Sequence, residues 1–171
     1  TLIEEFRLNL SLSSDITYRI LPQPHFYIKD TKIFRDKTKV SEEIGEVKDL
    51  KVFISRTNFF NKENININKI ELSKCNFFFN RKNLDYISDL LKKEFSQKKI
   101  LIKKSKLFFN DKNDNIIFIN KIKNLNLFKN YKENNNQIKT SGSLFKIPIS
   151  LFWQKDLNNK NTLLNFKAEK V

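Results

Sequence analysis

The residues that usually carry enzyme chemistry are few in this chain. It contains one histidine, one cysteine and two glycines among 171 residues. A histidine triad, a zinc cluster or a glycine-rich phosphate loop needs several such residues at short spacing, so none can be assembled. Carboxylates do stand close together, in Glu42 with Glu43 and in Asp111 with Asp114, but in polar segments typical of turns. We therefore predict a protein that is not an enzyme and holds no cofactor or metal, although a glycosidase carboxylate pair stays open on sequence alone.

The single histidine and the single cysteine both favour structural roles. His25 follows a proline and has no carboxylate or second metal ligand beside it, which is typical of a surface or packing residue. Cys75 occupies a position that recurs elsewhere in the chain as Thr31 and Ser105, so we expect a small packed side chain. One cysteine forms no internal disulfide, and the redox state of the compartment is not indicated.

The chain is strongly basic. It has 33 lysines and arginines against 19 aspartates and glutamates, a formal net charge of +14. Such a charge is typical of proteins that bind nucleic acid or an anionic membrane surface. Here the lysines are spread singly between apolar residues and do not gather in one segment, as a nucleic-acid footprint does. We interpret them as the solvated face and the protected edges of a sheet, and nucleic acid is not the expected partner.

The secondary structure is best indicated by the segment 99–127, KILIKKSKLFFNDKNDNIIFINKIKNLNL. Its apolar residues alternate with polar ones, which predicts half-buried antiparallel strands. A small residue at position 105 and a polar cluster at 110–115 divide it into strand, turn, strand, turn and strand. Two other segments, 28–34 and 72–78, align with 102–108, apolar on apolar and small on small. We therefore predict a β-hairpin unit that is repeated about three times, with its copies side by side.

Further alternating runs predict the remaining strands. Residues 6–12 and 18–20 predict a hairpin, 36–45 a loop, and 47–54 a strand. In the last third of the chain, the sequence predicts a polar turn at 131–137 and strands at 138–144, 147–153 and 164–168. Gly142 is expected to break the first of these strands. Pro148 predicts that the next strand is an edge strand or is bulged.

One segment has helical periodicity. Apolar residues recur every three or four positions between Asn83 and Phe95, with Asn83 as the predicted N-cap. The three phenylalanines Phe77–Phe79 cannot all face one way, so we expect this helix to cover part of a second face. The predicted fold is mainly β (α+β): one domain over 1–171, a curved, twisted antiparallel sheet forming a groove from repeated hairpins, with one short amphipathic helix near 83–95.

The predicted strands of this chain carry many apolar side chains. It has seventeen phenylalanines, more than a solvated sheet face would display. A curled sheet of this composition predicts a concave apolar surface that accepts acyl chains. The candidate lining residues are those that alternate most clearly: Val52, Ile54, Ile100, Ile102, Ile117, Ile119, Leu125, Leu127, Ile147, Ile149 and Leu151.

The order of motifs resembles the AsmA family of Gram-negative envelope proteins. Pro22 and Pro24 precede FYIKD, and VKDLKVFI, ININKIELSKCNFFFNRK, NLDYISDLLKKE, the segment 99–127 and SGSLFKIPISLFWQ follow in that order, up to about Trp153. The resemblance implies a twisted β-groove that is anchored to the inner membrane by an N-terminal helix and projects into the periplasm. It also implies a part in phospholipid movement and outer-membrane assembly. Because the chain lacks that anchor and contains no methionine, we expect it to be a section of a longer membrane-anchored chain.

The expected function is that of a non-enzymatic periplasmic module that binds or conducts phospholipid acyl chains and contributes to outer-membrane biogenesis. Its expected partners are phospholipid, the inner membrane through the missing anchor, and other envelope proteins. Two alternatives remain. Basic and aromatic residues interleave as in modules that bind nucleic acid or another polyanion, and the chain could instead be a structural scaffold for envelope assembly.

Overall fold

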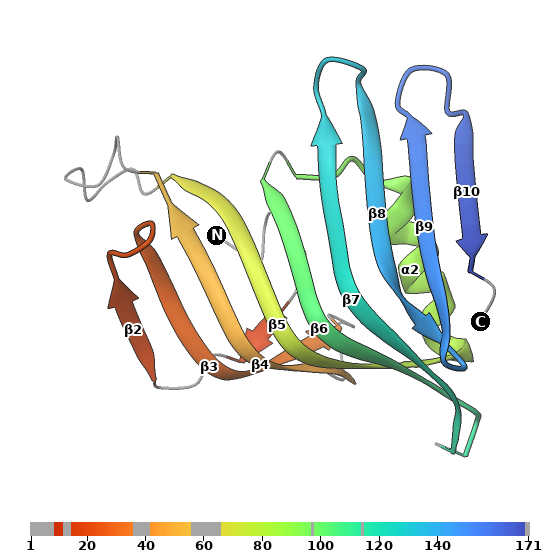
Figure 1. The fold of residues 1–171 in the computed structure, drawn as a ribbon, viewed down its shortest axis with the longest axis horizontal. Helices are drawn as coiled ribbons and strands as arrows, with labels where there is room; N and C mark the ends of the chain where they lie inside the picture. The colour runs from red at the N-terminus through yellow and green to blue at the C-terminus, as the bar shows by residue number, and fades with distance from the viewer. Residues whose placement is uncertain are drawn as a thin grey trace.

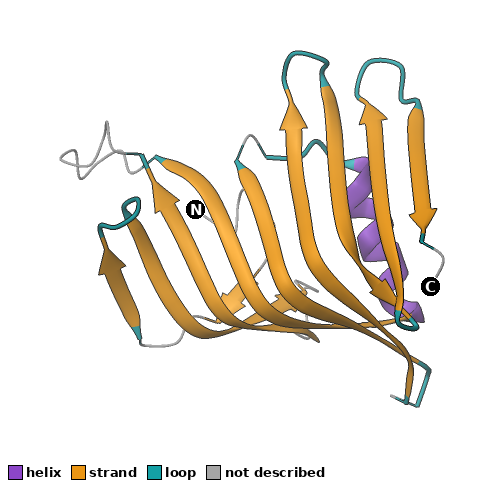
Figure 2. Ribbon diagram, in the orientation of Figure 1, coloured by secondary structure: helices purple, strands orange, loops and turns teal. Residues whose placement is uncertain are grey.

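The computed structural model describes residues 9–11, 15–35, 42–55, 66–96, 98–113 and 115–169. In these ranges the protein is mainly β, with one short helix (Figure 2). The strands are β1 Asn9–Ser11, β2 Ile16–Arg19, β3 His25–Arg35, β4 Glu42–Ile54, β5 Ile67–Asn80, β6 Lys99–Asn110, β7 Ile116–Asn130, β8 Asn135–Leu144, β9 Ile147–Asp156 and β10 Thr162–Ala168. A 3-10 turn, η1 Arg81–Asn83, leads into the helix α2, Leu84–Lys92. The predictions for Phe6, Leu8 and 56–65 lie outside the described residues.

All of these strands belong to one open, curved sheet (Figure 1). The order is β1-β3-β4-β5-β6-β7-β8-β9-β10, with β2 also paired to β3. Neighbours are antiparallel, as predicted, except β5 and β6, which are parallel. The sequence interpretation missed this pair because it did not consider that α2 connects β5 to β6, and a helical crossover returns the chain in the same direction.

The predicted hairpin between the first two strands is wrong. β1 pairs with Lys32–Phe34 and β2 pairs with His25–Ile28, so both lie along one edge of β3 without pairing with each other. β3 is long enough to hold two short strands end to end, and the alternation in each short strand does not reveal which partner it has.

The segment 99–110 is a single strand and does not turn at Ser105, contrary to the prediction. Lys104 has a left-handed backbone, with φ of 49°, and the aligned residues Asp30 and Lys74 have φ of 49° and 56°. In each case a left-handed residue lets two consecutive side chains point outward before the alternation resumes. The strand therefore bends without leaving the ladder, as a β-bulge does.

These bends line up across the sheet. The residue after each left-handed one, Thr31, Cys75 or Ser105, is at most 2% exposed, and the pairing adds Val47 on β4 and Ile122 on β7 to the same buried row. The backbone N–H of Cys75 donates to Ser105 Oγ at 3.0 Å and joins the parallel strands there. We call this row the crease, because the sheet bends along it (Figure 1).

The main core lies inside this bend. It is a cluster of buried residues from β3, β4 and β5, namely Ile28, Ile33, Ile44, Val47, Leu50, Val52, Ile70, Leu72 and Cys75, and Leu10 of β1 packs against it. Residues 42–45, predicted as loop, belong to β4, so Glu42 and Glu43 lie in a strand and not in a turn. The core needs this extension because Ile44 is among its members.

The helix agrees with the prediction apart from its ends. It lies behind β8 and β9 in the view of Figure 1, and the segment after it is tied to both strands. The backbone N–H of Phe95 donates to Asn136 Oδ1 at 2.9 Å, and Asn136 Nδ2 donates to the carbonyl of Lys93 at 2.7 Å. The Phe95 ring lies 5.9 Å from the Trp153 ring. These contacts fix α2 over one face of the sheet.

Three local predictions in the last third need correction. The turn at 131–137 ends at Asn134, because β8 starts at Asn135 and its second residue, Asn136, is a fully buried anchor for the helix segment. Gly142 does not break β8, which runs on to Leu144. β9 is not an edge strand, since β10 pairs with it. Pro148 is tolerated because β10 pairs only as far as Ile149, and the Pro148 carbonyl then accepts the backbone N–H of Glu169 at 3.0 Å.

Candidate functional site: the inner face of the sheet

The face on the inside of the bend, here called the inner face, carries two adjacent rows of mostly apolar side chains. Both rows run from β3 to β10, one residue per strand, and their register follows from the strand pairing. The first row is Ile28, Leu50, Leu72, Ile102, Leu125, Thr140, Leu151 and Phe166. The second row is Phe26, Val52, Ile70, Ile100, Leu127, Ile138, Trp153 and Leu164.

The burial of these rows decreases along the sheet. On β3 to β5 the side chains belong to the core, except that of Phe26, which packs against it, and Leu50 is 1% exposed. On β6 to β9 they are half-buried, as Ile102 and Leu125 are. On β10, Leu164 is 59% and Phe166 is 55% exposed. The inner face is therefore closed at the β3 end and offers apolar surface to solvent at the β10 end.

Six of the predicted lining residues lie in these two rows: Val52, Ile100, Ile102, Leu125, Leu127 and Leu151. Ile147 and Ile149 continue the same alternation down β9, opposite Leu144 and Gly142. Ile54 pairs with Ile67 at the end of β4 and is 7% exposed, so it is part of the packing.

The structure does not bring Ile117 and Ile119 to this set. Ile119 pairs with Phe108, one residue away from the Phe109–Phe118 pair, and so lies on the opposite face. Ile117 falls at a register shift between β6 and β7 and is 58% exposed. Alternation within one strand cannot show which of its two faces meets the neighbour, and the prediction had no other signal.

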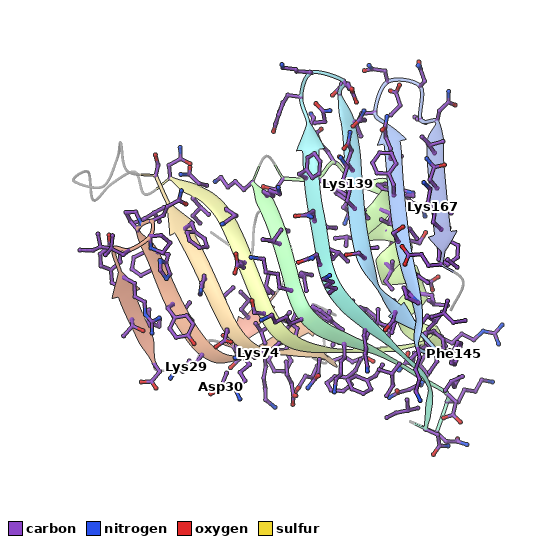
Figure 3. All side chains as sticks on the ribbon, viewed as in Figure 1. Lys29, Asp30, Lys74, Lys139, Phe145 and Lys167 are labelled. Atoms are coloured by element: carbon purple, nitrogen blue, oxygen red, sulfur yellow. The ribbon has the colours of Figure 1, made fainter. Side chains whose placement is uncertain are left out.

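Aromatic side chains extend the inner face beyond the crease. Phe109 and Phe118 stack with ring centroids 5.1 Å apart, and Phe77 stacks on Phe79 at 6.5 Å. Phe145, in the β8–β9 turn, lies 6.2 Å from Phe118 and is 69% exposed (Figure 3). Phe78 faces the other way and stacks on Phe108 at 5.5 Å, so the phenylalanine triplet divides between the two faces, as predicted. The sequence signal for these residues is the alternation within FFF and LFF, which does not by itself show which face carries a site.

The opposite, outer face gathers charge along the crease. Lys48, Lys74, Lys104 and Lys123 are exposed beside the buried row on β4, β5, β6 and β7. The carboxylate of Asp49 partly neutralises this positive charge. It accepts a hydrogen bond from Tyr27 Oη at 2.5 Å and forms an ion pair with Lys74 Nζ at 3.0 Å. Desolvation raises the pKa of the Asp49 carboxyl, but these hydrogen bonds outweigh it and hold the pKa below its usual value. The lysines are far apart in sequence, which is why the sequence did not predict this row.

His25 and Cys75 have the structural roles that the sequence favours. The His25 ring stacks on Phe53 at 5.0 Å, and its Nδ1 lies 2.7 Å from the Gln23 carbonyl. Cys75 is 1% exposed, and burial raises the pKa of its thiol to about 11, against a hydrogen bond with Ser105 that lowers it. A thiol that is buried and protonated at neutral pH is a poor nucleophile.

Within the described residues, no group of three or more histidine, cysteine, aspartate or glutamate side chains could hold a metal ion. None of the helical segments described is long and apolar enough to cross a membrane. Comparison of the chain with protein-family models and with curated proteins gives no match. A function for the inner face is therefore inferred from its strand register and its exposed apolar side chains alone.

Proposed function

We propose that the inner face is a groove that binds phospholipid acyl chains, and that the chain is a non-enzymatic lipid-binding module. One observation carries this proposal: two adjacent apolar rows cross eight strands and become progressively more exposed towards β10. Exposed apolar surface of this extent usually marks a site of apolar contact. An acyl chain gains about 0.8 kcal/mol for each methylene group that it buries.

The dimensions of the half-buried part suit a single acyl chain. Neighbouring strands lie about 4.8 Å apart, so the rows from β6 to β10 extend over about 19 Å. One leaflet of a bilayer has a hydrocarbon thickness of about 15 Å. The helix supplies one wall of the proposed groove, since Ile87, Leu90 and Leu91 of α2 are themselves only half-buried.

We further propose that the sheet is built from a repeated unit and continues a longer groove. The support is the bend at Asp30, Lys74 and Lys104, which recurs at aligned positions, each followed by a buried small residue. Together with the resemblance to AsmA proteins, this supports a periplasmic module of an inner-membrane-anchored chain that contributes to outer-membrane biogenesis. Repetition is expected in a conduit because each unit extends the same surface.

The test is the lipid that co-purifies with the protein from a lipid-containing source, measured by mass spectrometry per mole of protein. Leu164→Lys and Leu163→Lys form a matched pair, because the two leucines are neighbours on β10, are 59% and 50% exposed, and face opposite sides. We expect Leu164→Lys, on the inner face, to reduce bound lipid several-fold and Leu163→Lys to leave it unchanged. No lipid above background in the unmodified protein, or an equal loss in both variants, contradicts the proposal.

The outer lysine row favours a second candidate function, binding of a polyanion such as single-stranded nucleic acid. Exposed Lys48, Lys74, Lys104 and Lys123 follow one line across four strands, so a phosphate backbone laid along the crease would meet several of them. The assay is oligonucleotide binding as a function of salt. For this function, Lys104→Gln with Lys123→Gln should lower the slope of log K against log salt by about 1.4. The matched control replaces Lys112 and Lys146, which are exposed in turns, and an equal change in both pairs contradicts it.

A further inference from the structure

We propose that the outer face of β7 to β10 holds a second site, which binds the phosphate ester of a small polyol. A depression of about 590 Å³ lies there. It is lined by two neighbouring cross-strand rows, one residue from each strand, and by Thr140 and Leu151, which lie between the rows in sequence. All residues of the two rows are polar except Phe152. The lower row is Asn124, Ser141, Ser150 and Lys167. This site lies on the face opposite the proposed acyl groove and does not depend on it.

The second row gives the depression its wall. It consists of Asn126, Lys139, Phe152 and Asn165. The floor is low because Ser141 and Ser150, directly paired, are the smallest side chains of the two rows. The ring of Phe152 stands next to them and offers an apolar surface beside the hydroxyl groups. A flat sheet face with large residues throughout would not be hollow here.

The charge of the depression is positive and unbalanced. Its two charged residues are Lys139 and Lys167, which both lie on this part of the sheet (Figure 3), and no carboxylate lines it. The nearest acidic residue in the same cross-strand row, Glu71 on β5, is already paired with Lys103 at 3.0 Å and with Lys69 at 3.8 Å. Across the described residues, neither lysine of the depression is in an ion pair. The depression therefore offers an anion two ammonium groups that no carboxylate neutralises.

The position of Lys139 is restricted before any ligand arrives. Its ammonium group lies 5.6 Å from the centre of the Phe128 ring and 5.4 Å from that of Phe152, within cation–π range of both. Lysine loses much rotamer freedom when it is immobilised, and these contacts have already removed part of that freedom. A preorganised cation raises the affinity for an anion at this point.

A buried amide in the wall lacks a hydrogen bond. Asn126 Oδ1 is inaccessible to solvent and has no donor within the described structure. A buried acceptor without a donor is destabilising by about 1 to 3 kcal/mol, and a turn of the Asn126 side chain towards the depression would let a ligand hydroxyl supply the missing donor. Together with Asn124, Asn165 and the two serine hydroxyls, this makes a set of groups suited to a polyol, while the lysines suit its phosphate.

The chemistry that fits all of these groups is a phosphate carried on a hydroxylated three- to six-carbon skeleton. Two sources offer it: a soluble polyol phosphate, and the headgroup of a phospholipid such as phosphatidylglycerol. The probes are accordingly sn-glycerol 3-phosphate, measured by titration calorimetry, and vesicles of phosphatidylcholine with phosphatidylglycerol, measured by co-sedimentation. Glycerol and inorganic phosphate, titrated separately, show whether both halves of the ligand contribute.

Two variants test the site by different means. Lys139→Gln with Lys167→Gln removes its charge, and Ser150→Phe fills the floor without changing the net charge. We expect each to weaken glycerol 3-phosphate binding at least tenfold. The control, Lys106→Gln with Lys121→Gln, removes the same charge from a paired position elsewhere on the outer face, and should change binding less than twofold.

The outcomes separate the two sources. Binding of glycerol 3-phosphate that is lost in Ser150→Phe supports a soluble polyol phosphate, and vesicle binding alone that is lost in Ser150→Phe supports a lipid headgroup. The site is refuted if neither probe binds saturably, or if the control pair weakens binding as much as the site variants do. Because Leu164→Lys acts on the other face, failure of the acyl groove and failure of this site are observed independently.

Discussion

Replacement of Gly142 by alanine tests whether the crease is a fixed feature of the sheet. Gly142 lies on β8 opposite Ile122, where the β7–β8 register shifts by one residue. A Cβ at this position would lie 1.9 Å from the Lys121 carbonyl oxygen and 3.0 Å from its carbonyl carbon. Both are backbone atoms of the neighbouring strand, so a rotamer change cannot relieve the overlap.

The magnitude follows from the displacement that is needed. Ordinary contact requires the two backbones to separate by at least about 1 Å, which breaks the ladder around the bulge or forces it into strain. Overpacking of this kind costs about 1 to 3 kcal/mol, and lost ladder hydrogen bonds add to it, so we expect a destabilisation of about 2 to 4 kcal/mol. With a urea m-value of about 2 kcal/mol per molar, the midpoint falls by about 1 to 2 M.

The assay is equilibrium unfolding in urea followed by circular dichroism and by Trp153 fluorescence, because Trp153 lies on β9 next to the affected strand. Ser143→Ala is the control: it is on the same strand, one residue away, and removes atoms without adding any. We expect Ser143→Ala to remain within about 0.5 kcal/mol of the unmodified protein. A Gly142→Ala protein with that same stability would show that β7 and β8 are free to move apart, and would refute a fixed crease.

Three further predictions concern buried or paired groups. The Cys75 thiol, with its pKa raised to about 11, should resist alkylation at pH 8 in the folded protein. The unfolded thiol ionises from about pH 8.5, so the stability of the protein relative to Cys75→Ala should fall by up to about 3 kcal/mol between that pH and pH 11. Parallel curves of stability against pH for the two proteins would contradict this. The pKa of Asp49 is depressed in the folded protein, so the stability that this carboxylate contributes is present above about pH 4 and is lost as the pH falls through its folded pKa. Asp49→Asn should therefore flatten the acid side of the curve of stability against pH. An unchanged curve would show that the hydrogen bond from Tyr27 does not persist in solution. Asn136→Ala removes the acceptor of the Phe95 backbone N–H and should destabilise the protein by about 1 to 3 kcal/mol in urea unfolding, with faster hydrogen exchange at Phe95 as the specific readout.

Much of the fold could be predicted along the chain. The long alternation in β7 and β9, the helical periodicity of α2 and the polar turn at 110–115 are local signals, because side-chain direction repeats every two residues in a strand and about every 3.6 in a helix. The equivalence of Thr31, Cys75 and Ser105 was also visible, since a crowded row accepts only small side chains. The bend before those three positions was not visible, because lysine, which stands at 74 and 104, is not a residue type that favours a left-handed backbone, and aspartate at 30 alone is a weak signal.

The candidate site was predicted in part, and for the same reason. Six of the predicted lining residues lie in the two inner rows. Ile119 lies on the outer face instead, where it pairs with Phe108 of β6. The parallel β5–β6 pair changes which residues become neighbours, and no alternation pattern distinguishes a parallel partner from an antiparallel one. Ile28, Ile138 and Trp153 were not named as lining residues, although each lies in one of the rows.

The sequence by itself determined that this chain forms amphipathic strands rich in phenylalanine and lysine, with one helix and without the residues of a common catalytic motif. Tertiary structure alone decided which side chains share a row: the exposed lysines from Lys48 to Lys123, and the residues that line the depression around Ser141 and Ser150. Rows across a sheet arise from hydrogen-bonded register between segments distant in sequence. A pattern along one strand fixes what its two faces carry, and only the pairing fixes what each face is placed beside.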